Sequence, residues 1–142
     1  MSRPVPPTRA DFTRWRTITL RWADNDAYGH VNNTIYYQWF DSAVNTVLVD
    51  EGLLDIAAGD PICLVVGTAF DYFAPLSFPG EVEIGLGIAE LGRSSVRYRL
   101  GVFAPGADRA AAAGSFVHVA VSRAERRPVA WPDAWRQLFE RL

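Results

Sequence analysis

The sequence predicts an α+β fold, in which a five-stranded antiparallel sheet is wrapped around one long central helix and a short helix ends the chain. Two observations support this fold class. The apolar run Ile35–Val49 has the periodicity of a helix, and five other segments have the composition or alternation of strands. Because tight turns join the last four strand-like segments, consecutive strands are expected to pair antiparallel, and the apolar helix can cover one face of the sheet.

Residues 1–10 and the segment Thr17–Trp22 are expected to have different backbone structures. Three prolines fall within the first seven positions, so residues 1–10 are expected to form a flexible arm rather than a helix or a central strand. From Thr17 to Trp22 the residues alternate between polar and apolar, with Ile18, Leu20 and Trp22 facing one way. Period two with β-branched and aromatic residues predicts a strand there.

The central helix is predicted from the spacing of its apolar residues. The positions that share one face are Tyr36, Phe40, Ala43, Val44 and Val47. Three further apolar residues lie outside this stripe, namely Tyr37, Trp39 and Leu48. Such a nearly all-round apolar surface is typical of a helix surrounded by sheet. Asn32 and Asn33 are both good N-cap residues for its start, and Gly52 suits a C-terminal stop.

The rest of the chain is mostly β-rich. The four predicted strands are Cys63–Phe73, Val82–Ile88, Val96–Val102 and Ala110–Val121, and turn residues such as Pro79-Gly80 and Pro105-Gly106 separate them. Pro132 and Asp133 suit the first turn of a short terminal helix, Asp133–Leu142. A sheet with one covered face leaves an edge and a second face that need burial, which favours self-association.

Length and composition exclude several classes of protein. The chain has 142 residues, the length of one domain, so we expect a single domain over residues 1–142. The net charge of −2 gives no electrostatic reason to expect nucleic acid. Cys63 is the single cysteine, and the two histidines, His30 and His118, lack ligand spacing, so neither a disulfide nor a metal site is expected. With no signal peptide or apolar run long enough to cross a bilayer, a cytoplasmic protein without a membrane partner is expected. No cofactor is expected.

The loop before the central helix concentrates polar chemistry. Asp24 and Asp26 lie there together with a glycine, a histidine and two asparagines, all directly ahead of the helix. An acid is therefore brought near a helix N-terminus, where free N–H groups and the helix dipole favour developing negative charge. Asp24 is more typical of a residue that closes the turn, since aspartates are common in loops for that reason.

The motif Asp24-Asn-Asp26-Ala-Tyr-Gly-His-Val-Asn-Asn33, between a strand and an aromatic-rich helix, resembles the signature of hotdog-fold acyl-CoA thioesterases of the 4-hydroxybenzoyl-CoA thioesterase group. Later segments resemble that group in the same order, and they are Phe70–Leu76, Gly80-Glu81, Leu91–Ser95 and Arg127-Pro128. The resemblance implies a hotdog fold and hydrolysis of an acyl-CoA thioester, coenzyme A being part of the substrate. It also implies homodimers with two shared active sites, often paired as dimers of dimers.

By position, the resemblance implies that Asp26 is the catalytic carboxylate, acting as a general base for water or as a nucleophile. The helix N-terminus near Asn33 would polarise the thioester carbonyl, with Gly29 in the preceding turn. His30 is a further catalytic candidate, although its place in the motif favours a structural hydrogen-bonding role. The expected substrate-binding residues are Tyr28, Val31, Asn32, Tyr36, Tyr72, Arg93 and Ser94.

Several alternatives remain open. Tyr36, Tyr72 and Phe73 are either lining residues of an acyl pocket or ordinary core aromatics. The arginines that are candidates for coenzyme A phosphates, each of them otherwise typical of solvated surface, are Arg93, Arg123, Arg126 and Arg127. His118 is more typical of a satisfied core or interface residue than of a ligand. The alternative function is a non-catalytic acyl-CoA or acyl-carrier-protein binding module, whereas dehydratase chemistry is disfavoured because the helix carries no matching histidine and acid.

Overall fold

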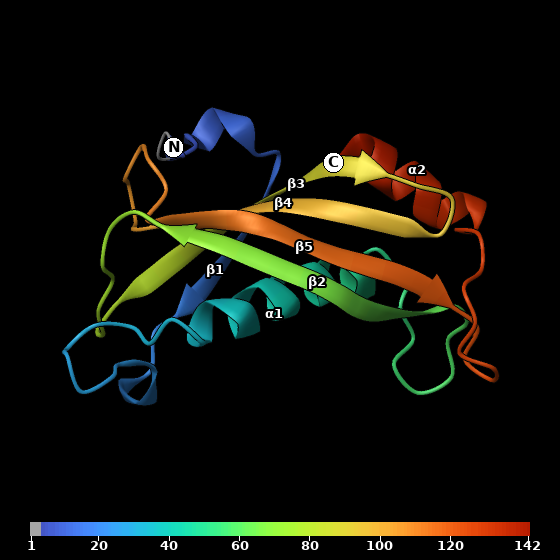
Figure 1. The fold of residues 1–142 in the computed structure, drawn as a ribbon, viewed down its shortest axis with the longest axis horizontal. Helices are drawn as coiled ribbons and strands as arrows, with labels where there is room; N and C mark the ends of the chain where they lie inside the picture. Colours follow the sequence, from blue (N-terminus) through green and yellow to red (C-terminus); the bar gives the residue numbers. More distant parts are fainter. Residues whose placement is uncertain (1–3) are drawn as a thin grey trace.

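The structure, a computed structural model, describes residues 4–142 and has the α+β architecture that the sequence predicts (Figure 1). One antiparallel sheet contains five strands in the order β1-β3-β4-β5-β2. The strands are β1 (Arg14–Thr19), β2 (Ile62–Tyr72), β3 (Glu81–Leu91), β4 (Ser95–Phe103) and β5 (Ala112–Val121). The helices are α1 (Ile35–Asp50) and α2 (Asp133–Arg141), and two short 3₁₀ helices cover Arg9–Asp11 and Trp22–Asp24.

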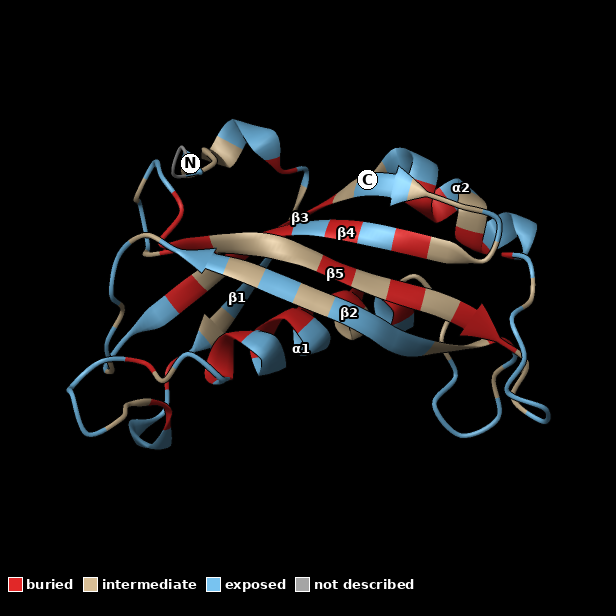
Figure 2. Ribbon diagram, in the orientation of Figure 1, coloured by how far each residue is buried: buried red, intermediate tan, exposed pale blue. Residues whose placement is uncertain are grey.

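Helix α1 lies along one face of the sheet and supplies the centre of the core (Figures 1 and 2). Its predicted apolar stripe is buried throughout, and Phe40 is fully buried in the same cluster as Ile84 and Leu100 from the strands. Burying one such side chain contributes roughly 1.5–3 kcal/mol. The all-round pattern is only partly confirmed, because Tyr37 is 41% exposed although its ring packs against that of Phe70 in β2, with centroids 4.3 Å apart.

Helix α2 extends the inner layer beyond the end of α1. Trp135, Leu138 and Phe139 are buried in the main cluster, and the ring of Phe139 meets that of Tyr98 edge-on at 5.9 Å. Its observed span agrees with the predicted terminal helix. Within residues 4–142, no helix is both long and apolar enough to cross a bilayer.

The first strand lies three residues earlier than the alternation predicts, since β1 spans Arg14–Thr19 rather than Thr17–Trp22. Leu20 is buried as predicted, but Trp22 is 80% exposed at the start of a 3₁₀ helix. The Asp24 carboxylate explains this difference: Oδ2 accepts the Arg21 N–H at 2.7 Å and Oδ1 accepts the Arg21 guanidinium at 2.8 Å. These bonds close a turn and end the extended conformation.

The expectation of a flexible arm over residues 1–10 requires a correction. Residues 1–3 lie outside the described part of the chain, but the segment that follows is docked on the outer face of the sheet. Arg9 forms an ion pair with Glu83 at 2.7 Å, and Phe12 packs where Gly85 and Gly101 carry no side chain. A Cβ at either glycine would lie 2.7 Å from the Phe12 ring. Prolines exclude regular structure here, but they do not exclude docking.

The two ends of the sheet carry different loops. The start of α1 and the end of β2 lie together at one end, whereas the β3–β4 turn and the loop after β5 lie at the other (Figure 1). β1 and β2 are the two edge strands. The candidate functional residues of the loop before α1 are therefore placed at one end of the sheet, beside an edge strand.

Candidate active site

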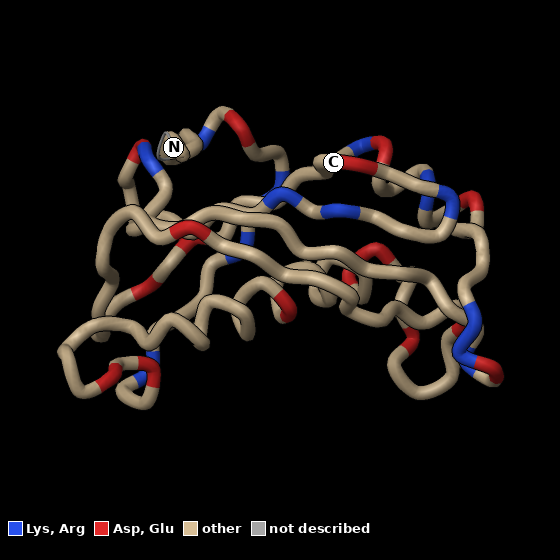
Figure 3. The backbone as a smooth tube through the Cα atoms, viewed as in Figure 1, with Lys and Arg blue, Asp and Glu red and all other residues tan. Residues whose placement is uncertain are grey.

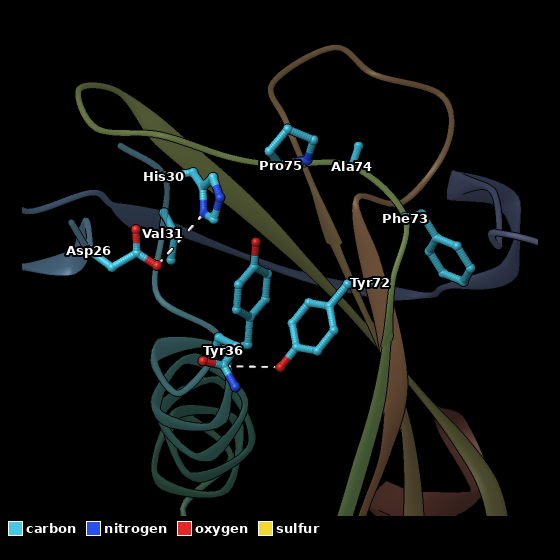
Figure 4. Close-up of a pocket in the computed structure, with 9 residues that line it drawn as sticks. Asp26, His30, Val31, Tyr36, Tyr72, Phe73, Ala74 and Pro75 are labelled. Carbon is cyan, nitrogen blue, oxygen red and sulfur yellow. Dashed lines mark hydrogen bonds and ion pairs between the residues drawn. The ribbon is translucent and has the colours of Figure 1, made fainter. Parts of the chain in front are cut away.

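A cleft of about 340 Å³ opens where the start of α1 faces the end of β2 (Figure 4). One wall is the loop before α1 with the first helical turn, and the other is the end of β2 with the loop that follows. The lining residues are Asp26, His30, Val31, Asn33, Tyr36, Tyr72, Phe73, Ala74 and Pro75. An apolar, aromatic cleft with a few convergent polar groups is typical of a small-molecule site.

Backbone hydrogen bonds hold the loop that carries Asp26. Asn25 and Val31 form an antiparallel bridge. The Asp26 N–H donates to the His30 carbonyl at 2.9 Å, and the Gly29 N–H donates to the Asp26 carbonyl at 3.2 Å. Gly29 has a φ of +86°, a conformation that side chains disfavour. The loop is therefore a tight turn that fixes the position of the carboxylate.

The Asp26 carboxylate uses one oxygen for structure and presents the other to the cleft. Oδ1 accepts the Tyr28 N–H at 2.8 Å. Oδ2 lies 3.8 Å from Nδ1 of His30, beyond hydrogen-bond distance, although the two groups point toward one another in Figure 4. The side chain of Asp26 is 19% exposed. One oxygen is thus accessible to a water molecule or to a substrate.

The start of α1 differs from the predicted cap. Thr34 is the N-cap residue and makes no capping bond through its side chain. Asn32 closes the turn before the helix, because its Oδ1 accepts the N–H and the hydroxyl of Thr34 at 2.9 and 2.8 Å. The side chain of Asn33 caps nothing, and its N–H donates to no other residue of the described chain. An unused backbone donor therefore stands at the helix start, beside the cleft.

Tyr36 and Tyr72 form the floor of the cleft. Their rings meet edge-on at 5.1 Å, and the Tyr72 hydroxyl donates to the Asn33 carbonyl at 3.0 Å. Burial, with a contribution from Tyr72, raises the pKa of Tyr36 to about 12. Burial also raises the pKa of Tyr72. Both phenols are therefore protonated near neutral pH and act as hydrogen-bond donors.

Some predicted site residues lie near the cleft without lining it. Tyr28 is 85% exposed, and its ring stacks on that of His30 with centroids 6.5 Å apart. Gly29 and Asn32 shape the backbone of the loop and the helix start, as described above. Their contribution is the geometry of the turn rather than a side chain in the cleft.

The predicted phosphate-binding residues lie elsewhere. Arg93 and Ser94 belong to the β3–β4 turn, at the end of the sheet opposite the start of α1 (Figure 1), and Figure 3 marks basic residues in blue at that end. Since β3 has 11 residues, about 35 Å of strand separates that turn from the cleft. Arg123 binds the loop 55–59, because its guanidinium donates a hydrogen bond to the Ile56 carbonyl at 3.0 Å. One chain alone does not bring these basic residues to the cleft.

Sequence reasoning missed several residues that shape the cleft. Ala74 and Pro75 line its second wall, and the signal for them was only their place in the segment that follows the predicted strand. Asn25 was not singled out, yet its Oδ1 accepts the Phe78 N–H at 3.0 Å and ties the two walls together. The Val31 N–H adds a second tie through the carbonyl of Leu76 at 2.7 Å.

Two further candidates are structural. Asp24 is 1% exposed and bound to Arg21, as expected of a turn residue. His118 is 2% exposed, so it belongs to the core as predicted, but its Nδ1 finds no partner among the described residues and the expectation of a satisfied histidine is wrong. Burial lowers the pKa of His118 to about 4.

Among residues 4–142, no group of three His, Cys, Asp or Glu side chains is arranged to hold a metal ion.

Comparisons with known proteins agree with this architecture. Residues 20–139 match the thioesterase-like superfamily. No curated protein matches the sequence significantly.

Solved structures include similar chains. The PA5185 protein from Pseudomonas aeruginosa strain PAO1 is 50% identical, with a TM-score of 0.94 over 97% of this chain and 96% of that one. The PA2801 protein from the same species, a candidate thioesterase, is 29% identical, with a TM-score of 0.80 over 87% of this chain and 95% of the other. A 1,4-dihydroxy-2-naphthoyl-CoA thioesterase from Synechocystis shares the fold at 21% identity, with a TM-score of 0.80 over 90% and 96% of the two chains.

Proposed function

The chain belongs to the thioesterase-like superfamily and has a hotdog fold, and from this premise we propose that it hydrolyses an acyl-CoA thioester to a free carboxylic acid and coenzyme A. One observation carries the proposal. The free oxygen of Asp26 and the unused N–H of Asn33 border the same apolar cleft, although they come from opposite ends of the loop. Catalysis of thioester hydrolysis needs both a group that activates water and a hydrogen-bond donor for the carbonyl oxygen.

In the proposed reaction, the thioester carbonyl oxygen accepts the Asn33 N–H at the start of α1. Negative charge develops on that oxygen as the tetrahedral centre forms, and one preorganised donor is worth roughly 3–4 kcal/mol there. Oδ2 of Asp26 takes a proton from water as the water oxygen attacks the carbonyl carbon. The C–S bond then breaks, and the proton passes to the leaving thiolate.

A second route is direct attack by Asp26 on the carbonyl carbon, which expels the thiolate and forms a mixed anhydride that water then opens. Single turnover in ¹⁸O-labelled water detects the second route if the label enters the Asp26 carboxylate. General-base catalysis puts the label in the released acid, whereas attack of water on the Asp26 side of an anhydride leaves it in the protein.

We further propose that the active form is a homodimer joined along β2. Three features support this pairing: β2 is a long edge strand, Val66 in its middle is 62% exposed, and a groove of about 550 Å³ runs between α1 and the start of β2. A two-fold axis near the middle of β2 continues the sheet across the pair. It also brings the end of one subunit that carries Arg93 and Ser94 beside the cleft of the other, where the phosphates of coenzyme A need arginines. The pairing of such dimers into tetramers stays a prediction.

The test is a panel of aliphatic, aromatic and carrier-bound thioesters, with free thiol as the readout. We expect wild type to hydrolyse members of the panel and Asp26→Asn to lose about 100- to 10,000-fold in kcat while it keeps the fold and ligand binding. Asp41→Asn is the matched control, because Asp41 is an exposed residue of α1 away from the cleft. Full activity in Asp26→Asn refutes the assignment of Asp26. Binding of acyl-CoA without any turnover by wild type supports the binding module instead.

A further inference from the structure

The hydroxyl of Tyr36 is a donor without a partner at the wall of the cleft. Tyr36 is 3% exposed, yet its hydroxyl forms no hydrogen bond with any residue described by the structure. Tyr72 differs from it, because the Tyr72 hydroxyl is already used by the Asn33 carbonyl. Of the two phenols in the cleft, only that of Tyr36 is therefore available to a ligand. A polar group that lines an apolar cleft and has no partner within the chain is available to a ligand that supplies an acceptor.

The position of this hydroxyl is fixed by its surroundings. Tyr36 lies in the first turn of α1 and lines the same cleft as Asn33, which precedes the helix. Its ring meets that of Tyr72 at 5.1 Å and that of Trp39 at 5.0 Å, both at steep angles. Figure 4 shows its hydroxyl pointing into the cleft, on the side where His30 and Asp26 lie. The donor is therefore both rigid and directed at the space a substrate would occupy.

We propose that the Tyr36 hydroxyl donates a hydrogen bond to the carbonyl oxygen of the bound thioester, as a second donor beside the Asn33 N–H. This inference rests on the proposed function, since it assigns a role at the same site. The phenol keeps its proton throughout, so the step needs no further acid, base or oxidant. The burial that raises the pKa of Tyr36 keeps the hydroxyl in the donating form. Preorganised donors of this kind stabilise the charge that develops on the oxygen in the transition state.

The kinetic test is Tyr36→Phe, which removes the hydroxyl and keeps the ring that packs against Tyr72 and Trp39. We expect kcat to fall about 100-fold with KM changed less than threefold and the melting temperature unchanged. Tyr37→Phe is the matched control, because Tyr37 is the next residue, is 41% exposed and does not line the cleft. Equal kcat values for Tyr36→Phe and wild type overturn the proposal, and so does a loss confined to KM.

A binding test separates this inference from the proposed function. Two non-hydrolysable coenzyme A thioethers of equal chain length are compared by calorimetry, one with a ketone next to the S–CH₂ group and one without it. We expect the ketone to bind wild type more tightly, and Tyr36→Phe to keep only the smaller part of that preference that the Asn33 N–H supplies. The same preference for the ketone in both proteins overturns the role of Tyr36 alone. Failure of both ligands to bind wild type overturns the proposed function as well.

Discussion

Because His118 is buried, we expect the free energy of unfolding to fall steeply below pH 6.5. His118 is 2% exposed and burial lowers its pKa from 6.5 to about 4. The unfolded chain therefore binds a proton at a higher pH than the native protein does, so stability is full above the unfolded pKa and is lost as the pH falls through the interval between 6.5 and about 4. The rings that meet His118 are those of Tyr98 at 5.8 Å and Phe116 at 4.8 Å, and neither offers a charge to stabilise the imidazolium.

The magnitude follows from the same two pKa values. A difference of about 2.5 units corresponds to roughly 3 kcal/mol at most, and linkage assigns about 2 kcal/mol of that loss to the interval from pH 7 to pH 5. Many carboxylates titrate over the same range, so the quantity to measure is the difference between wild type and His118→Leu, which cannot titrate. Urea denaturation of both proteins at pH 7 and pH 5, at one fixed protein concentration, yields the two free energies of unfolding.

We expect wild type to lose about 2 kcal/mol more than His118→Leu between pH 7 and pH 5. Parallel losses in the two proteins refute the reasoning, because they would mean that the imidazole is hydrated or paired in the native state. An NMR titration of the folded protein gives an independent check. The His118 ring must remain neutral at pH 5, where an exposed histidine is mostly protonated.

Two further predictions concern the outer face and the edge of the sheet. Phe12→Ala should destabilise the protein by about 3 kcal/mol, because it empties the space above Gly85 and Gly101. Urea denaturation measures this loss. An unchanged denaturation midpoint would contradict the docking of the N-terminal segment that carries Phe12. Val66→Asp should convert dimers to monomers, because it sets two like charges near each other across a two-fold axis on β2 while the exposed site tolerates the charge in one chain. Analytical ultracentrifugation reports the mass, and a variant that remains dimeric places the interface elsewhere.

Local patterns were sufficient for the secondary structure wherever neighbouring residues decide it. The helical spacing in 35–49 and the alternation in 82–88 and 96–102 each predicted the element that the structure contains. The failures occurred where a side chain acts on the backbone. Asp24 ended β1 early by bonding to Arg21, and the N-terminal segment docked because two glycines across the sheet left room for Phe12. Neither effect has a periodic signature.

The sequence by itself determined the strands, the two helices and the polar loop that carries Asp26, because each of these depends on residues close together along the chain. Tertiary structure alone decided which groups meet at the cleft. The end of β2 faces the start of α1 because β2 joins the sheet at its far edge, beyond β5. That arrangement occupies the hydroxyl of Tyr72, leaves the hydroxyl of Tyr36 free, and holds Arg93 at the opposite end of the molecule. Contacts between residues distant in sequence follow from strand order, and no local pattern contains that information.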